Sequence, residues 1–490
     1  MNQTGRQDSR LDSLRSYPLL QAMQERRSRR LARGKSVHAY ELTYSGDENK
    51  AQPLGALEEA VLICSTGLTG VLMHDGPLEK PDGKPEELGS MFINVLARSA
   101  PSPDNCQATS LFMINDEGTW LIKCPRGRTA AELLKNVPSS WLEWTEKDWK
   151  HVADAMKVKV HEKRIDFPRK FPFYVGWNKQ LSNPPGSTIF LPVLDCTRQY
   201  INILLGLLSE PEGQRPLFVD DWQRFRPRSV KDFAAWIGQH LGLSQKIPYQ
   251  PIGGIDRATD GFVNRDIPIP LGYARMWRID SEMFFLLQNL MLLGEAMGLG
   301  AWGHACAFVP YIFQRNEKEG VLGLGFQHVV PPKPVTSAPM PAPLPNPVGI
   351  PGKLEALCPP FVANMDEAVD KIIEEKFGGD GIFAERQCDL LARAYNKEEN
   401  AQTYINHLKP HEQYTPQAVQ YAKDICNYIY ETYGRFPAHV NAFHAPGYWL
   451  QFHHLEEEYY ETYFKPSQWR NQAEHQELWH PDEHPSDNSH

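Results

Sequence analysis

Arginines crowd one short segment near the start of the chain. They are Arg26, Arg27, Arg29, Arg30 and Arg33, with Ser28 among them. Guanidinium groups bind phosphate through charge-assisted, partly bidentate hydrogen bonds, and a serine hydroxyl adds a further donor. The segment is therefore a candidate phosphate site. A solvated basic helix end, or a weak nucleic-acid patch, is the alternative interpretation.

A second candidate is the proline-bounded turn that follows Arg98. Pro101 and Pro103 force the chain to turn, and Asn105 and Gln107 follow them. The amide of Asn105 offers both a hydrogen-bond donor and an acceptor. The turn could therefore hold a polar ligand, although an ordinary turn residue is the alternative interpretation of Asn105.

The third candidate is the most apolar stretch of the chain, residues 278–313. Between residues 283 and 297 only Gln288, Asn289 and Glu295 are strongly polar, which predicts a helix in the interior of a large domain. Asp280 or Ser281 would cap this helix, and Gly298 would end it. The glycines at 298, 300 and 303 match the pattern G-x-G-x-x-G, but here a helix precedes them rather than a strand. We expect a turn that allows another strand or a flat ligand to approach the backbone closely.

Together the three motifs resemble those of the nitroreductase-like flavin oxidoreductases, including the branch related to azoline dehydrogenases of peptide maturation. Residues 26–30 are similar to the family's Arg-x-Ser-x-Arg/Lys element. Residues 100–107 are similar to its Ala-Pro-Ser-x-x-Asn-x-Gln-Pro turn, with Ala108 in place of the closing proline. Residues 288–303 are similar to its buried helix and glycine turn.

The resemblance implies that the protein binds FMN. Asn105 and Gln107 would then meet the flavin ring, and the backbone of Gly303, His304 and Ala305 would face its reactive N5 edge. The phosphate would be held by Arg26, Arg27, Ser28 and Arg30. The side chain of His304 is a weak candidate for a proton donor, because a buried histidine more often has a structural role.

The resemblance also implies a fold and an activity. The expected fold is α+β, a three-layer α/β/α sandwich that forms a homodimer with the flavin at its interface. The expected enzyme is an FMN-dependent oxidoreductase that moves hydride through N5 between NAD(P)H or oxygen and a small organic substrate. A non-catalytic binding or recruitment protein on the same fold is the alternative.

The histidine-rich C-terminal region is a competing site. His439, His444, His453 and Glu457 are weak candidates for metal ligands, and His453 and Glu457 would share one face of a helix. The same spacing arises in any helix that carries a histidine and several glutamates, so the preferred interpretation includes no metal. A metal-dependent oxygenase sited here is a further hypothesis.

Changes in composition divide the chain. A hairpin is expected over residues 111–123, and a proline-rich linker separates the flavin domain from a C-terminal extension. The expected boundaries are a disordered N-terminus at 1–14, a flavin domain at 15–330 with an insertion at about 128–270, a linker at 331–352, a helical extension at 353–465 and a disordered tail at 466–490.

The overall composition is that of an ordinary globular protein. The chain has 490 residues, of which 41% are hydrophobic and 23% are charged, and its net charge is −9. An acidic surface argues against nucleic-acid binding. The N-terminus lacks the apolar core of a signal peptide, and the eight cysteines are scattered without a C-x-x-C motif. A cytoplasmic protein that is not inserted in a membrane is expected.

Overall fold

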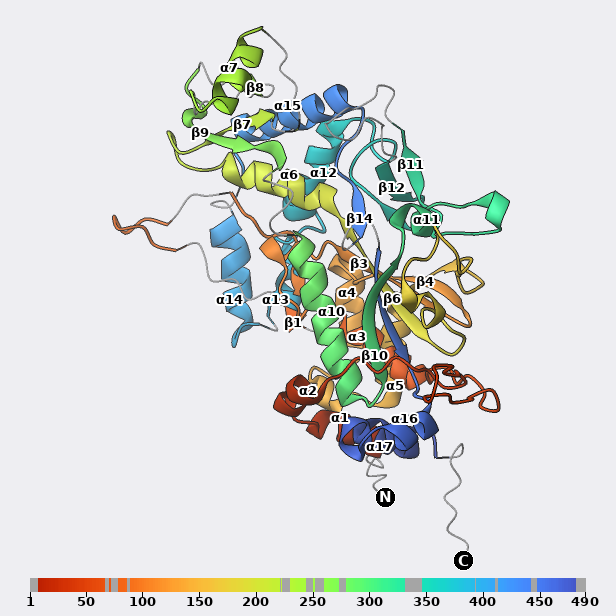
Figure 1. Cartoon of the computed structure of the whole chain (residues 1–490). Helices are drawn as coiled ribbons and strands as arrows, with labels where there is room; N and C mark the ends of the chain where they lie inside the picture. Colours follow the sequence, from red (N-terminus) through yellow and green to blue (C-terminus); the bar gives the residue numbers. More distant parts are fainter. Residues whose placement is uncertain are drawn as a thin grey trace, which may run out of the picture.

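The computed structural model contains both helices and sheets, as the α+β class predicts (Figure 1). It describes residues 8–66, 70–71, 78–85, 89–220, 222, 230–243, 250–251, 260–272, 279–330, 346–392, 394–409, 413–441 and 447–481. Among these residues, no helix is long and apolar enough to cross a membrane.

An antiparallel sheet forms the centre of the molecule (Figure 1). Its strands run in the order β10-β15-β6-β3-β4-β5, and β14 pairs with the end of β6 that β15 does not reach. The strands are β3 (Thr109–Asn115), β4 (Gly118–Ile122), β5 (Lys157–His161), β6 (Thr188–Asp195), β10 (Gly300–Ala307), β14 (His439–Asn441) and β15 (Gly447–His453). The hairpin predicted over residues 111–123 is confirmed as β3 and β4, with Asn115 opposite Gly118.

The two faces of this sheet are covered differently. Successive strand residues point to opposite faces, so Leu111 and Met113 of β3 join one hydrophobic core while Phe112 and Ile114 join another. The first core is completed by helices α3 (Ala56–Ser65), α5 (Glu146–Met156) and α10 (Ile279–Ala296).

The opposite face is covered mainly by irregular chain. Phe167, Phe173 and Tyr174 pack there together with residues of the short helix α11 (Val309–Phe313) and of the segment that follows it. The prediction of a third layer, made of helices, is therefore wrong for the part of this face that the structure describes. Bulky aromatic side chains fill the space that a helical layer would occupy.

The expected insertion and the expected C-terminal extension share one core. Leu204 of α6 and Phe218 of β7 pack in the same cluster as Ile372 of α12 and Ile425 of α15. These elements are α6 (Cys196–Leu207), β7 (Pro216–Asp220), β8 (Gln250–Pro251), β9 (Asn264–Pro270), α12 (Met365–Phe377) and α15 (Pro416–Tyr433). The two regions pack together because each exposes an apolar face that the other buries. Within residues 128–270, β5 and β6 belong to the central sheet.

The C-terminal region is not an appended helical unit. Strand β15 lies between β10 and β6, so residues 447–453 are part of the main sheet. The tail predicted to be disordered from residue 466 contains α17 (Arg470–Trp479), in which Gln472 and His475 are buried. These residues are ordered because they pack against the end of α10 and against α3.

Two smaller predictions about irregular chain also need correction. Within the expected N-terminal disorder, residues 9–16 form α1 (Ser9–Ser16), which buries Leu11. Within the expected linker, residues 346–350 form β12 (Asn346–Ile350) between β11 (Gln327–Val329) and β13 (Leu354–Glu355). Residues 331–345 of the linker lie outside the described part.

The remaining elements lie around these cores (Figure 1). They are α2 (Leu19–Glu25), α4 (Gly127–Lys135), α7 (Val230–His240), α13 (Cys388–Leu391), α14 (Glu398–Thr403), α16 (Glu457–Tyr463), β1 (Gly70–Val71) and β2 (Leu96–Ala97).

Helix α10 ends as predicted, but Asp280 and Ser281 lie within its first turn rather than capping it, and the helix is only partly enclosed. It runs to Ala296, and Gly298 follows with a φ of 69° that favours glycine. Phe284 and Phe285 are 37% and 47% exposed, so the prediction that the helix is buried on all sides is wrong. Near its C-terminal end, the Glu295 carboxylate accepts a hydrogen bond of 2.6 Å from Nη1 of Arg29, and both side chains are buried.

We predict that Arg29→Ala lowers the free energy of unfolding by about 3–5 kcal/mol, because it leaves the buried Glu295 carboxylate without its cation. Urea denaturation measures this loss. Lys84→Ala is the matched control, because Lys84 pairs with Asp82 in an exposed ion pair and its removal should cost about 0–1 kcal/mol. Equal losses in the two variants would contradict the prediction.

Candidate cofactor site

A buried carboxylate near the start of α10 holds the proline-bounded turn. Oε2 of Glu282 accepts a hydrogen bond from Oγ of Ser102 at 2.7 Å, and Oε1 accepts one from the backbone N–H of Thr109 at 2.7 Å. The Arg98 guanidinium lies 3.8 Å from the same carboxylate and donates to the carbonyl of Thr109. The turn is thereby fixed at both ends against one helix.

The backbone of this turn is strained. Asp104, Asn105 and Gln107 have φ values of 53°, 48° and 50°, in the left-handed region that residues other than glycine rarely adopt. Such conformations cost about 1–3 kcal/mol each and cluster at functional sites. The strain therefore supports a binding role for the turn.

The two predicted amide side chains are linked to each other. Nδ2 of Asn105 donates to the carbonyl of Asn94 at 2.6 Å, and Nε2 of Gln107 donates to Oδ1 of Asn105 at 2.6 Å. Among the described residues, Oε1 of Gln107 is buried and accepts no hydrogen bond. A buried acceptor without a donor costs about 1–3 kcal/mol, so a ligand N–H at this position would be stabilising.

Gln107 also lines a cavity of about 500 Å³. Asn94 and Cys124 also line this cavity, and Arg126 and Glu375 contribute charged groups to its lining. The described lining includes no residue of segment 26–30 or of segment 303–305. Of the predicted cofactor residues, Gln107 alone lines this space.

The cationic segment lies beside the strand that follows the glycine turn. Ser28 forms a parallel bridge with Ala301, two residues before Gly303. Arg27, Ser28 and Arg30 are exposed and Arg26 is half-buried, whereas Arg29 is occupied by Glu295. The first and third motifs are therefore neighbours in space, although about 270 residues separate them in the sequence.

Tyr448 of β15 connects all three motifs. A Cβ atom added to Gly303 would lie 1.7 Å from the Tyr448 hydroxyl, so the phenol lies directly on the backbone of Gly303. The ring also packs against the apolar cluster that contains Cys106, inside the strained turn. Burial raises the pKa of the phenol, and the charge of Arg26 opposes this shift. Tyr448 thus contacts the third motif at Gly303, packs against a cluster to which the second motif contributes Cys106, and interacts electrostatically with Arg26 of the first.

Sequence reasoning did not single out Tyr448 or Glu282 as site residues. Tyr448 is one of several aromatic residues in a segment that was expected to be a helical appendage. Glu282 lies at the start of the predicted apolar helix, where an acidic residue is common and gives no signal of a binding role. The glycine at 303 could have indicated that an aromatic ring lies against the backbone there, because a residue without a side chain leaves room for a neighbouring ring.

The side chain of His304 is enclosed by the central sheet. Its ring lies 4.1 Å from the ring of Trp302, centroid to centroid, and the residue is 3% exposed. Burial lowers its pKa to about 3. The imidazole is therefore neutral at neutral pH and is not an imidazolium proton donor. Gly303 and Ala305, on either side of His304, are half-buried.

The four predicted metal ligands do not form a site in the described structure. His439 is on β14, His453 ends β15, and Glu457 begins α16, so the expected helical face shared by His453 and Glu457 does not exist. Nδ1 of His453 instead faces Nε2 of Gln451 at 3.2 Å. His444 lies outside the described residues.

Comparison of the chain with protein-family models, curated proteins and solved structures finds no match. The resemblance therefore depends on the three motifs and on how they are arranged here.

We predict that His304 makes stability depend on pH. Its pKa is about 3 when folded and about 6.5 when unfolded, so the unfolded chain takes up a proton first as the pH falls. Stability should therefore fall below pH 6.5, by up to about 1.4 kcal/mol per pH unit from this group. Urea denaturation between pH 7 and 5 should show a shallower pH dependence for His304→Gln than for the unsubstituted protein. Parallel curves would contradict this assignment.

Proposed function

We propose that the protein is an FMN-dependent oxidoreductase that transfers hydride between NAD(P)H or oxygen and a small organic substrate. The observation that carries the proposal is the position of Tyr448, which touches Gly303 and the cluster around Cys106 and lies within the electrostatic reach of Arg26. These contacts support the proposal that the three motifs, selected from the sequence for one ligand, act at one site.

The groups in this region fit the chemistry of FMN. Arg26, Arg27 and Arg30 have guanidinium groups that would hold the phosphate, with the Ser28 hydroxyl among them. The unsatisfied Oε1 of Gln107 would accept from an N–H at the edge of the ring, and Asn105 orients that amide. When bound, the flavin would supply the hydride chemistry, and the chain would supply orientation and exclusion of water.

The proposed active form is a homodimer. Leu19, Leu20 and Met23 of α2 are 66%, 69% and 58% exposed, and α2 packs on α10, which exposes Phe284 and Phe285. Clustered exposed apolar side chains are typical of protein interfaces. A second chain packed here would cover the helices next to the cationic segment.

We predict that the isolated protein is yellow or becomes yellow when FMN is added. Arg26→Ala and Arg30→Ala should each weaken FMN binding by about 10-fold to 100-fold, because each removes a charge-assisted contact to phosphate. The same variants should leave the binding of riboflavin, which lacks the phosphate, nearly unchanged.

Titrations followed by flavin fluorescence measure both affinities. Arg315→Ala is the control, because Arg315 pairs with Glu317 at the surface. A folded protein that binds neither flavin would refute the proposed function. Equal losses for FMN and riboflavin would refute the phosphate role of the arginines alone.

We predict that the double substitution Leu20→Glu and Met23→Glu converts the dimer to a monomer, because four buried charges would be introduced into a symmetric interface. Sedimentation velocity measures the change in mass. Leu78→Glu is the control, since Leu78 is 67% exposed and does not belong to α2 or α10. A monomeric unsubstituted protein would contradict the dimer.

A further inference from the structure

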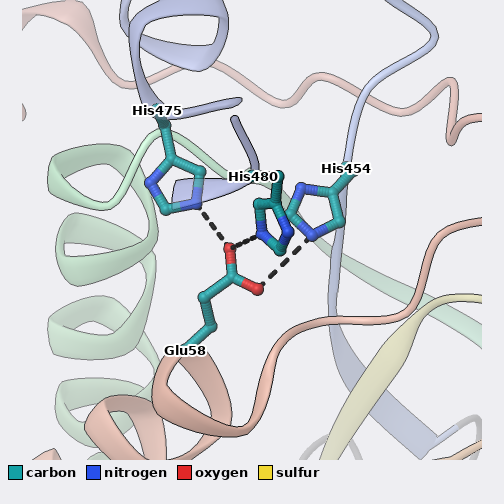
Figure 2. A group of neighbouring side chains, drawn as sticks. All are labelled: Glu58, His454, His475 and His480. Atoms are coloured by element: carbon teal, nitrogen blue, oxygen red, sulfur yellow. Dashed lines mark hydrogen bonds and ion pairs between the residues drawn. The ribbon is translucent and has the colours of Figure 1, made fainter. Parts of the chain in front are cut away.

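Three histidines surround one buried glutamate where the C-terminal segment meets α3 (Figure 2). Nε2 of His475 lies 2.5 Å from Oε1 of Glu58, and Nε2 of His480 lies 3.2 Å from the same oxygen. Nε2 of His454 lies 3.4 Å from Oε2. All four potential ligand atoms lie within 4.8 Å of one another.

These four atoms are close to the arrangement that a tetrahedral ion requires. Zinc binds imidazole nitrogen and carboxylate oxygen at about 2.0–2.2 Å, which separates neighbouring ligand atoms by about 3.3 Å. The distance from Nε2 of His480 to Oε1 is 3.2 Å and that from Nε2 of His454 to Oε2 is 3.4 Å, both near this value, whereas Nε2 of His475, at 2.5 Å from Oε1, would have to move away from the oxygen to admit the ion. Each imidazole presents its Nε2 atom to the centre (Figure 2).

Hydrogen bonding within the cluster does not satisfy all of its members. His454 is 4% exposed, and its Nε2 atom makes no hydrogen bond of acceptable geometry among the described residues. It nevertheless points toward the carboxylate (Figure 2). An unsatisfied buried nitrogen facing two other imidazoles and a carboxylate is explained if all four share an ion.

The carboxylate is held in position by its own helix. Glu58 is the third residue of α3, and Oε2 accepts a hydrogen bond from the backbone N–H of Gly55, the residue that precedes the helix. This bond orients the side chain and leaves Oε1 toward His475 and His480. Outer contacts of this kind fix the orientation of metal ligands in many proteins.

We propose that Glu58, His454, His475 and His480 bind one Zn²⁺ ion in a structural site. Four protein ligands complete a tetrahedron and leave no position for a substrate, which distinguishes structural zinc sites from catalytic ones. Three imidazoles and one carboxylate also suit zinc better than Ca²⁺ or Mg²⁺, which prefer oxygen. The site is separate from the proposed flavin function.

The ion would fasten the end of the chain to the core. Glu58 belongs to α3, His454 follows β15, His475 belongs to α17, and His480 follows that helix. Helix α17 lies so close to the turn after α10 that a Cβ on Gly298 would be 2.3 Å from Cβ of His475. The preceding carbonyl of Gln468 accepts from Nε of Arg29 at 2.6 Å, so the fastened segment covers the Arg29–Glu295 pair.

Zinc content of the full-length protein tests this assignment. After incubation with one equivalent of ZnCl₂ and gel filtration, mass spectrometry of the metal should find about one zinc per chain. Competition with a fluorescent zinc chelator should show affinities lowered by about 100-fold or more in His475→Ala and His480→Ala. Chelation should lower the melting temperature of the unsubstituted protein and have no effect on these variants.

His407→Ala is the matched control, because His407 is exposed and lies outside the cluster, and it should retain zinc. His480 lies at the edge of the cluster, so His480→Ala preserves most of the buried packing; circular dichroism checks that the variants are folded. If a variant fails to fold, X-ray absorption of the zinc-loaded unsubstituted protein should show three imidazoles and one oxygen ligand. Less than about 0.1 zinc per chain, zinc retained in both variants, or a shell of oxygen ligands alone would overturn the proposal.

Discussion

Two buried carboxylates on α10 constrain how the rest of the chain can pack. Glu282 and Glu295 lie near opposite ends of an 18-residue helix, and each is almost fully buried. Since a buried carboxylate is stable only with donors or cations around it, each must attract polar groups from elsewhere. Glu282 holds Arg98 and the strained turn, and Glu295 holds Arg29 of the cationic segment. One helix therefore positions two motifs that are far apart in the sequence.

The central sheet depends on a strand from the C-terminal region. Strand β15 lies between β10 and β6, so β10 joins the rest of the described sheet only through a strand from the C-terminal region. Its residue Tyr448 then lies on Gly303, while its end leads into His454. The same strand therefore connects the proposed flavin region with the proposed zinc site. The second core, whose described members lie between residues 200 and 271 and between residues 348 and 438, shows the same long-range dependence.

Local elements of the fold could be predicted because their signals are local. The hairpin formed by β3 and β4 and the helix α10 follow from alternation, apolar composition and glycines. The predictions that failed concerned packing partners. Residues 447–453 contain aromatic and aliphatic side chains that suit a buried strand or a buried helix equally, and periodicity does not distinguish the two. They form a strand because the backbone groups at the edges of β6 and β10 need hydrogen-bond partners, which β15 supplies.

The amino-acid sequence by itself determined the candidate groups: an arginine cluster with Ser28, amides at 105 and 107, and a glycine where a ring can approach. Tertiary structure alone decided which of these groups meet. Arg29 forms an ion pair with Glu295, and Tyr448 contacts Gly303. Glu58 lies among histidines that are about 400 residues further along the chain. Such contacts arise from burial and charge compensation between distant segments, and neither leaves a periodic pattern in the sequence.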